Sequence, residues 1–365
     1  MELKKIKGHE DAMKRAIALA KRASGDTHPN PIVGAVIVED GEIVAEGWHE
    51  RAGMPHAERR ALANLRRPPK PGATLYVTLE PCSTHGRTGA CTDAIVAAKI
   101  SNVVVGATDP NPAHCGRGLE ILRQSGVNVV AGVLARECEN LNPIFNHAIR
   151  KNTPLLAAKC ALLPDGKMFR VCGERLQITG EKSRNNVMIE RRYFPAIAVG
   201  SGTVVCDNPA LTARIAGEPV FCPVRFVFDR SGRTLELTTN PKVFSDEFAS
   251  RTILATTEKT ALRAEKILQR SGVRVLPLPD NNEKFWEKFR AFCMENSLTG
   301  VYFEGGEILL KSLFATHQAD WLYAYVAGTP EKSPEKFFCD EAEIVVAGTK
   351  RFDNDVEIFG AISYR

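Results

Sequence analysis

The sequence contains no long apolar segment. A membrane-spanning helix needs roughly 18 consecutive apolar residues, and no such run occurs in the chain. Residues 1–16 also lack the apolar core of a secretion signal. We therefore expect a cytoplasmic protein without a membrane partner. In that compartment the ten cysteines suit metal binding or burial better than disulfide formation.

The sequence also has little excess charge of either sign. Its 48 basic and 43 acidic residues give a net charge of +5 over 365 residues. A nucleic-acid binder would show a concentrated basic stripe, so we expect no nucleic-acid partner. A phosphorylated small substrate is compatible with this charge. Glycine-rich nucleotide motifs of the GxGxxG and Walker A types are absent as well.

The length of the chain predicts two domains, because single hydrophobic cores rarely exceed roughly 300 residues. In the first half, a helix over residues 9–24 precedes a hairpin whose turn is Asp40-Gly41. Helices and strands then alternate, which indicates an α/β sheet with helices on its faces. We expect strands over 73–80, 102–109 and 127–133, helices over 56–67 and 116–126, and a loop followed by a helix over 81–100.

The segment 141–154 marks the expected boundary, which gives domains over residues 1–150 and 151–365. Strand and helix patterns alternate again beyond it, so the second half is also predicted to be of the α/β class. The expected strands cover 154–162, 196–204, 224–229, 251–257, 273–278, 300–306 and 319–328, and the expected helices cover 181–193, 283–295 and 307–314.

Three segments of the first half carry residues suited to metal chemistry. His56 lies in Pro55-His56-Ala57-Glu58 at the start of a helix, Cys82 follows a strand, and Cys91 comes nine residues later. One imidazole and two thiolates form a catalytic zinc set, because the fourth tetrahedral position stays open for water. Bound zinc lowers the pKa of that water to roughly 7. Glu58 is placed to take the proton from the water and pass it to a leaving amine.

The spacing of the two cysteines separates this site from other zinc deaminases. The common signature ends in Cys-x-x-Cys, whereas eight residues separate Cys82 from Cys91. Asn30 and His49 lie at loop and strand ends, and we expect both to face the same pocket. Alternatively, Asn30 is a turn residue and His49 is a structural histidine, and neither faces the pocket.

The motifs THPNPIVGAVIV, GWHERAGMPHAE, ATLYVTLEPCSTHGRTGACTDAI and GATDPNP resemble the deaminase half of the bifunctional deaminase–reductases of riboflavin biosynthesis. The resemblance implies a cytidine-deaminase-like α/β/α domain that hydrolyses the 2-amino group of a diaminopyrimidinone carrying a phosphoribosylamino group. It also implies that His56, Cys82 and Cys91 bind zinc and that Glu58 is the proton donor. The substrate-binding residues that it implies are Asn30, His49, His85 and Arg87. Arg60 departs from the family, which commonly has a histidine at this position.

The second half resembles the reductase domain of the same family through GSGTVVCDNPALTAR and the segment Phe303-Glu304-Gly305-Gly306. This implies a dihydrofolate-reductase-like α/β domain in which NADPH reduces the ribosyl chain to a ribityl chain. The implied substrate-binding residues are Arg175, Arg191, Leu211, Arg214 and Glu304. The implied cofactor-binding residues are Ala161, Gln177, Thr203, Asp207 and Gly306. Arg175 and Gln177 replace the family's serine and tryptophan, and Trp321 stands where an acidic residue is usual.

Two other functions are considered. A nucleic-acid-editing deaminase would have a basic second half rich in aromatic residues and a Cys-x-x-Cys pair, and neither feature is present. Alternatively, the chain is a deaminase only, with a catalytically silent C-terminal dimerisation module. The chain is expected to form a homo-oligomer, either a dimer or a tetramer. We also expect no disulfide among the cysteines outside the zinc site, which are Cys115, Cys138, Cys160, Cys172, Cys206, Cys222, Cys293 and Cys339.

Overall fold

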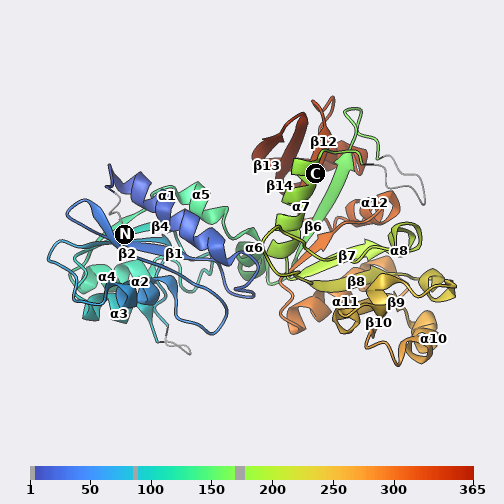
Figure 1. Cartoon of the computed structure of the whole chain (residues 1–365), viewed down its shortest axis with the longest axis horizontal. Helices are drawn as coiled ribbons and strands as arrows, with labels where there is room; N and C mark the ends of the chain where they lie inside the picture. Colours follow the sequence, from blue (N-terminus) through green and yellow to red (C-terminus); the bar gives the residue numbers. More distant parts are fainter. Residues whose placement is uncertain (1–4, 85–88, 169–176) are drawn as a thin grey trace. The chain divides into compact units, whose positions relative to one another are not determined.

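The chain folds into two compact units, Met1–Asn152 and Thr153–Arg365 (Figure 1). The computed structural model describes residues 5–84, 89–168 and 177–365. Within these residues no helix combines the length and the apolar character that crossing a membrane requires.

The first unit is built on a five-stranded sheet with the strand order β2-β1-β3-β4-β5. Strand β1 is antiparallel to β2 and β3, whereas β3, β4 and β5 are parallel. The strands are β1 Gly34–Glu39, β2 Glu42–Trp48, β3 Thr74–Leu79, β4 Asn102–Ala107 and β5 Asn128–Ala131. The helices are α1 His9–Ala20, α2 Ala57–Leu65, α3 Cys91–Ala97, α4 Arg117–Gln124, α5 Ala135–Glu139 and α6 Pro143–Lys151.

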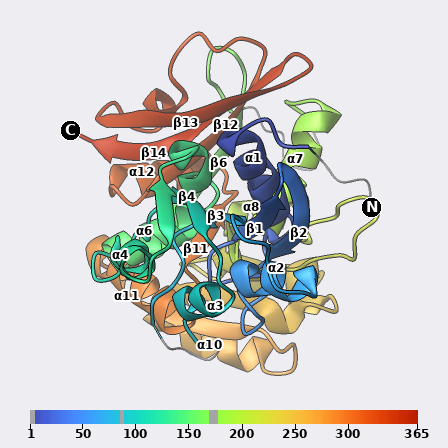
Figure 2. The same ribbon diagram turned by 90° about the vertical axis from the view of Figure 1, so that its left-hand side faces the viewer.

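Helices cover both faces of this sheet, α1 and α5 on one side and α2, α3 and α4 on the other (Figure 1). Side chains alternate along a strand, so β1 supplies both layers: Val36 packs with α1 and Ile37 packs with α2. All six residues of β1 are buried as a result. Helices α2 and α3 lie next to each other on their face of the sheet, as both views show (Figures 1 and 2).

Two glycines allow helices to lie directly against the strands. A Cβ atom at Gly34 would come within 2.0 Å of the Ala16 carbonyl oxygen in α1, and one at Gly47 would come within 2.5 Å of the Ala57 carbonyl oxygen in α2. Only glycine permits so close an approach of backbone to backbone. Gly47 therefore sets the position of α2, whose first turn carries Glu58.

The second unit is built on a nine-stranded sheet with the order β10-β9-β8-β7-β11-β6-β12-β14-β13. The seven strands from β10 to β12 are parallel, and the hairpin β13–β14 adds two antiparallel strands to β12. The strands are β6 Leu155–Leu162, β7 Ala196–Gly200, β8 Val224–Phe228, β9 Thr252–Thr257, β10 Arg274–Leu278, β11 Gly300–Phe303, β12 Trp321–Ala327, β13 Ala342–Phe352 and β14 Asp355–Tyr364. The helices are α7 Glu181–Tyr193, α8 Ser201–Asp207, α9 Lys242–Ser245, α10 Glu258–Leu268, α11 Asn282–Glu295 and α12 Glu307–Ala315.

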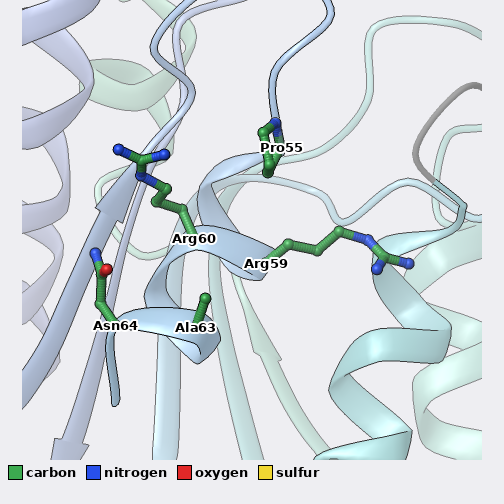
Figure 3. A pocket seen from close by; sticks show the side chains of 5 residues that line it. All are labelled: Pro55, Arg59, Arg60, Ala63 and Asn64. Atoms are coloured by element: carbon green, nitrogen blue, oxygen red, sulfur yellow. The ribbon is translucent and has the colours of Figure 1, made fainter. Parts of the chain in front are cut away.

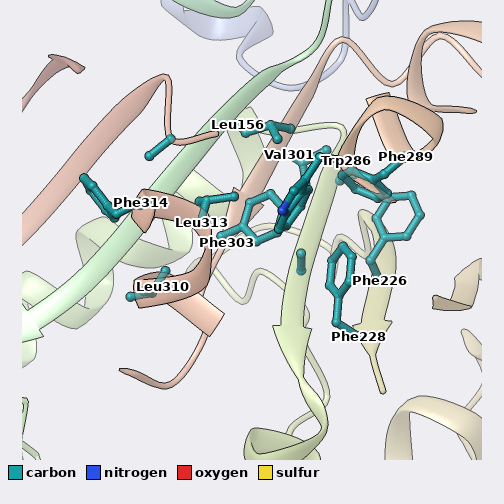
Figure 4. Packing of buried hydrophobic residues seen from close by; sticks show 14 of the residues in the cluster. Leu156, Phe226, Phe228, Trp286, Phe289, Val301, Phe303, Leu310, Leu313 and Phe314 are labelled. Atoms are coloured by element: carbon teal, nitrogen blue, oxygen red, sulfur yellow. The ribbon is translucent and has the colours of Figure 1, made fainter. Parts of the chain in front are cut away.

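An aromatic cluster fills the core between this sheet and helices α11 and α12 (Figure 4). Phe228 is central to it: its ring centroid lies 5.1 Å from that of Phe289, 5.7 Å from that of Trp286 and 5.7 Å from that of Phe303. Such ring pairs stabilise a core by about 0.5–1.5 kcal/mol beyond the area they bury. The cluster fixes β11, which lies between β6 and β7 at the centre of the sheet.

The sequence-based expectations hold for most elements and fail at several others. The strand expected over 196–204 ends at Gly200, because residues 201–207 form α8, so Thr203 lies on a helix. Helices α5, α6, α9 and α10 and the β13–β14 hairpin are not predicted, and α6 lies within the segment 141–154 expected only as a boundary. The hairpin residues are half exposed, so its strands lack a clear buried stripe. The disulfide expectation is wrong at Cys206, which is disulfide-bonded.

Cys172 lies outside the described residues, and eight of the described cysteines are free. Those eight include Cys82 and Cys91 and the remaining six of the set expected to be unpaired. The expectation fails at Cys206 because a redox compartment says nothing about which sulfur atoms the tertiary structure brings together.

A buried pair of carboxyl groups lies between α7 and the sheet of the second unit. Glu190 is 7% exposed and Glu357 is fully buried. Tyr302 Oη donates a hydrogen bond to Glu190, Asn186 Nδ2 donates another at 3.1 Å, and Lys350 Nζ lies 2.9 Å from Glu357. Burial, and then the neighbouring Glu357 carboxylate, raise the pKa of Glu190 well above its usual range.

The first prediction concerns the pH dependence of stability. In the unfolded chain a glutamate has an ordinary pKa of about 4.3. At pH values between this pKa and the raised pKa of Glu190 in the folded protein, Glu190 is protonated in the folded protein but ionised in the unfolded chain. The free energy of unfolding therefore falls as pH rises through this window, by at most about 1.4 kcal/mol per pH unit for one proton. Glu190→Gln should flatten this slope in urea unfolding curves recorded between about pH 5 and pH 8. The exposed Glu120→Gln serves as control, and equal slopes for Glu190→Gln and the unaltered protein would contradict the prediction.

Candidate functional site

The three expected zinc ligands come together at the ends of separate elements. His56 is the N-cap residue of α2, Cys82 follows β3, and Cys91 is the first residue of α3. The Cys82 carbonyl accepts hydrogen bonds from the backbone N–H groups of Cys91 at 3.0 Å and Thr92 at 3.2 Å. These bonds close the loop between the two cysteines at its base, so the nine-residue spacing still places both sulfur atoms at one point.

The distances between the ligand atoms suit a zinc ion. His56 Nδ1 lies 3.5 Å from Cys82 Sγ and 3.3 Å from Cys91 Sγ, and all three atoms lie within 4.8 Å of one another. Zinc bonds of about 2.3 Å to sulfur and about 2.0–2.1 Å to nitrogen, at the tetrahedral angle, imply an S···N separation of about 3.5 Å. The donor set and its geometry therefore fit zinc, with one coordination position left over.

The environment favours thiolate at this site. Hydrogen bonds from the Cys91 thiol and from His56, together with the Cys91 backbone N–H, lower the pKa of Cys82 to about 4, against the effect of burial. Cys91 is fully buried, and its proximity to Cys82 raises its own pKa. Without a metal, one proton is thus shared in a dithiol pair. A divalent cation removes the need for that proton.

Glu58 lies in the first turn of α2 and is 3% exposed. Burial raises the pKa of Glu58, and the Cys82 thiolate adds to the rise, while the Glu58 backbone N–H, His56 and Cys91 oppose it. The site thereby holds a carboxyl group whose proton affinity exceeds that of a glutamate in water. Such a group suits proton transfer near neutral pH.

Asn30 and His49 are brought together behind His56. The Asn30 Nδ2 atom lies 3.3 Å from His49 Nε2, and His49 Nδ1 lies 3.2 Å from the Pro55 carbonyl oxygen. Burial lowers the pKa of His49, so the ring is neutral, with the proton on Nδ1 and a lone pair on Nε2 facing the Asn30 amide. His49 thus anchors the residue before His56. His85 and Arg87 lie outside the described residues.

Two further residues, Glu80 and Asn142, position the site, although the sequence patterns alone assign neither of them a role. Glu80 is 5% exposed and accepts hydrogen bonds from the backbone N–H groups of Asp109 at 3.1 Å, Gly116 at 2.9 Å and Gly118 at 2.8 Å. Asn142 binds both the N–H and the carbonyl of Ile32, at 2.8 and 3.0 Å. A glutamate directly after a strand and before Pro-Cys is the only sequence signal for the role of Glu80.

A pocket of about 380 Å³ lies beside the first turns of α2 (Figure 3). It is lined by Pro55, Arg59, Arg60, Ala63 and Asn64, and none of the three zinc ligands contributes to it. Figure 3 shows the two guanidinium groups pointing apart. Arg59 donates to the Ala90 carbonyl at 2.9 Å, next to Cys91, and Arg60 forms an ion pair with Glu50. The pocket therefore flanks the metal site and does not contain it.

In the second unit, four of the expected substrate-binding residues lie close together. Arg191 forms a two-pronged ion pair with Glu304 at 2.5 and 2.8 Å and donates to the Thr212 carbonyl at 3.0 Å. Arg214 donates to the Thr212 hydroxyl at 3.1 Å, and Leu211 is buried in the same segment. Burial would raise the pKa of Glu304, but the Arg191 guanidinium outweighs it and lowers the pKa. Arg175 lies outside the described residues.

Four of the five expected cofactor residues lie at the carboxyl ends of adjacent parallel strands. Ala161 is in β6, Thr203 and Asp207 are one turn apart on α8 directly after β7, and Gly306 is the N-cap of α12 directly after β11. Strand β11 lies between β6 and β7, so these positions share one edge of the sheet. Ligands of α/β sheets bind at such an edge, where the strand order reverses. Gln177 is exposed before α7, and nothing places it against this edge.

Comparison with known proteins identifies both units. Residues 6–107 match the model of the cytidine and deoxycytidylate deaminase zinc-binding region, and residues 154–329 match the RibD C-terminal domain. The riboflavin biosynthesis protein RibD of Actinobacillus pleuropneumoniae is 41% identical, over 87% of this chain and 83% of that protein. The chain belongs to the RibD family. The RibD protein of Aquifex aeolicus is also 41% identical, over 86% of this chain and 85% of that protein.

Solved structures agree with this assignment over the whole chain. A Thermotoga maritima diaminohydroxyphosphoribosylaminopyrimidine deaminase/5-amino-6-(5-phosphoribosylamino)uracil reductase is 32% identical, with a TM-score of 0.77 and coverage of 98% of this chain and 99% of that one. Acinetobacter baumannii RibD is 29% identical, with a TM-score of 0.78 and coverage of 97% and 99%. The expected fold class is confirmed: a cytidine-deaminase-like domain precedes a dihydrofolate-reductase-like domain. Zinc is confirmed as a cofactor of the family's deaminase domain, and the chain contains both enzyme domains.

The second prediction concerns Glu58. Glu58→Gln keeps the shape of the side chain and the three metal ligands but cannot carry the proton. Zinc content should equal that of the unaltered protein, while ammonia release falls by about 10²-fold or more. The surface variant Glu120→Gln is the matched control, because it makes the same chemical change away from the site. Near-normal ammonia release by zinc-loaded Glu58→Gln would place the proton transfer elsewhere.

Proposed function

We propose that the chain catalyses two consecutive reactions of riboflavin biosynthesis. Residues 1–150 deaminate 2,5-diamino-6-(5-phosphoribosylamino)pyrimidin-4-one, and residues 151–365 use NADPH to reduce the ribosyl chain of the product to a ribityl chain. The observation that carries the first step is the convergence of His56, Cys82 and Cys91 beside the buried Glu58. The Thermotoga maritima structure, named for both activities, supports the pairing of the two steps in one chain.

In the first step, a zinc ion held by the three ligands would supply a Lewis acid and an activated water. The Glu58 carboxylate takes the proton of the attacking water and delivers it to the amine that leaves the ring carbon. Its burial keeps bulk water from competing for that proton. We assign the substrate contacts to Asn30, His49, His85 and Arg87. The hydrogen bond between Asn30 and His49 holds these two side chains in a fixed orientation toward the pyrimidine ring of the substrate.

In the second step, NADPH bound to the second unit would supply the hydride that reduces C1′ of the ring-opened ribosyl group. Ala161, Gln177, Thr203, Asp207 and Gly306 are assigned to the cofactor. The carboxyl edge of β6, β11 and β7 supports this assignment for four of them, because the backbone N–H groups at the start of α12 favour a phosphate there.

The phosphate and hydroxyl groups of the substrate are assigned to Arg175, Arg191, Leu211, Arg214 and Glu304. The charges of Arg191 and Glu304 neutralise each other, which leaves Arg214 as the exposed guanidinium among the described residues of this group. Guanidinium groups match phosphate geometry, so Arg214 is the stronger candidate for the phosphate contact. Glu304 and Arg191 then orient each other and present hydroxyl-binding edges.

We further propose that the protein works in the cytoplasm as a homo-oligomer, a dimer or tetramer. Strand β13 supports the assembly, because it is an edge strand of 11 residues whose Val345 and Val346 side chains are 63% and 44% exposed. Exposed apolar edge strands favour pairing with another chain. Sedimentation equilibrium of the purified protein measures the assembly directly.

The third prediction tests the reductase. The zinc-loaded protein should oxidise NADPH when the deaminated pyrimidine is supplied directly, which bypasses the first step. Arg214→Gln should raise the KM for this substrate by about tenfold or more, because a charge-assisted hydrogen bond is worth roughly 1.5–3 kcal/mol. Arg263→Gln, which alters an exposed arginine of α10, should leave KM unchanged. If the folded protein does not oxidise NADPH, the second unit is a silent module and the chain is a deaminase only.

A further inference from the structure

A second group of metal-ligating side chains lies in the second unit. In the described part of the chain, only two sets of His, Cys, Asp or Glu bring three ligand atoms within 4.8 Å of one another. One is the zinc site of the deaminase unit, and the other is His317, Cys339 and Glu341. We propose that His317, Cys339 and Glu341 bind a second divalent transition-metal ion, of the Zn²⁺ or Co²⁺ class.

The three ligands come from different parts of the fold. His317 lies in the turn between α12 and β12, and Cys339 and Glu341 lie in the segment that leads into β13. Residues 317 and 339 are far apart in the sequence, so only the tertiary structure brings them together. An ion at this point would tie the β13–β14 hairpin to the turn that follows α12.

The backbone around each ligand is fixed. His317 N–H donates to the Phe314 carbonyl at 2.9 Å, Cys339 N–H donates to the Glu335 carbonyl at 3.2 Å, and the Glu341 carbonyl accepts from Arg365 N–H at 3.1 Å. Short-range bonds of this kind reduce the conformational entropy that the ligands lose when an ion binds. The site is therefore partly organised before the metal arrives.

The imidazole ring is oriented by two contacts. It stacks on Tyr364, with ring centroids 4.3 Å apart and planes inclined by 17°, and the Tyr364 hydroxyl is held by the Ala319 carbonyl at 3.1 Å. On the other side His317 Nε2 lies 3.3 Å from the Glu341 carboxylate. A carboxylate and an imidazole thus already adjoin, and Cys339 adds a sulfur atom to the set.

The nearby positive charges are engaged elsewhere. Lys336 Nζ donates to the Asp340 and Ala342 carbonyls at 2.8 and 2.7 Å, and Arg365 pairs with Glu343. Neither needs the Glu341 carboxylate. One thiolate, one imidazole and one carboxylate form a mixed donor set that suits Zn²⁺ and Co²⁺ better than Mg²⁺ or Ca²⁺.

This site differs from the deaminase site in exposure. The side chains of His317 and Glu341 are 49% and 64% exposed, whereas Cys91 of the first site is fully buried. Metal ions can therefore enter and leave from solvent, and binding should be weaker than at the first site. Because the ion binds the folded hairpin and not the unfolded one, it should raise the thermal unfolding midpoint of the protein.

The test is a Co²⁺ titration of the zinc-loaded protein under reducing conditions. We expect one further equivalent of Co²⁺ to bind, with the near-ultraviolet charge-transfer absorption of a cobalt–thiolate bond. Cys339→Ser should abolish that absorption. His317→Gln or Glu341→Gln should raise the dissociation constant by at least about tenfold, since changing even a residue that only orients a metal ligand costs roughly 10–100-fold in affinity. Cys115→Ser, which removes another exposed cysteine, should leave the titration unchanged.

Zinc content and ammonia release are measured in the same samples. Both should stay unchanged in the Cys339→Ser protein, which separates this site from the deaminase site, and circular dichroism verifies the fold of each variant. Absence of an additional equivalent of Co²⁺ in the unaltered protein would overturn the proposal. So would a charge-transfer absorption that survives Cys339→Ser, or one that develops only as zinc is released.

Discussion

Two sulfur atoms and one imidazole nitrogen must lie about 3.5 Å apart to hold a tetrahedral zinc ion, and three parts of the first unit are fixed to meet this requirement. The Cys82 carbonyl receives the first N–H groups of α3, and the His49 ring supports the residue before His56. Gly47 lets α2 settle directly on the sheet. The sheet, covered on both faces, supplies the rigidity that such short distances need.

The two candidate sites differ in the protonation and pairing of their buried charged groups. In the first unit, burial raises the pKa of Glu58, whereas hydrogen bonds from Cys91 and His56 lower the pKa of Cys82 against the effect of burial, so the group suits both a cation and a proton transfer. In the second unit the buried charges already compensate each other through Arg191 and Glu304. That arrangement suits a site whose chemistry is carried by a bound cofactor and whose own groups orient the reactants.

The structure shows the partners of two residues that depart from the family pattern, Arg60 and Trp321. Arg60, where a histidine is usual, forms an ion pair with Glu50 at the margin of the pocket beside α2 and stays clear of the ligand atoms. Trp321, where an acidic residue is usual, begins β12 and pairs in register with Ala157 and Ala361. The Arg60 backbone N–H also donates to the His56 carbonyl at 3.0 Å, so both positions have partners in the surrounding structure.

The sequence by itself predicted the donor set of the first unit, because His56, Glu58, Cys82 and Cys91 lie at strand and helix ends that local patterns reveal. It also determined the α/β class and most of the elements. Only the tertiary structure decided which distant residues meet: Glu80 with the loop over 109–118, Arg191 with Glu304, and His317 with Cys339. The same holds for the disulfide at Cys206 and the hairpin β13–β14. Local periodicity reports which face of an element is buried, whereas contacts between remote segments depend on packing that no single segment encodes.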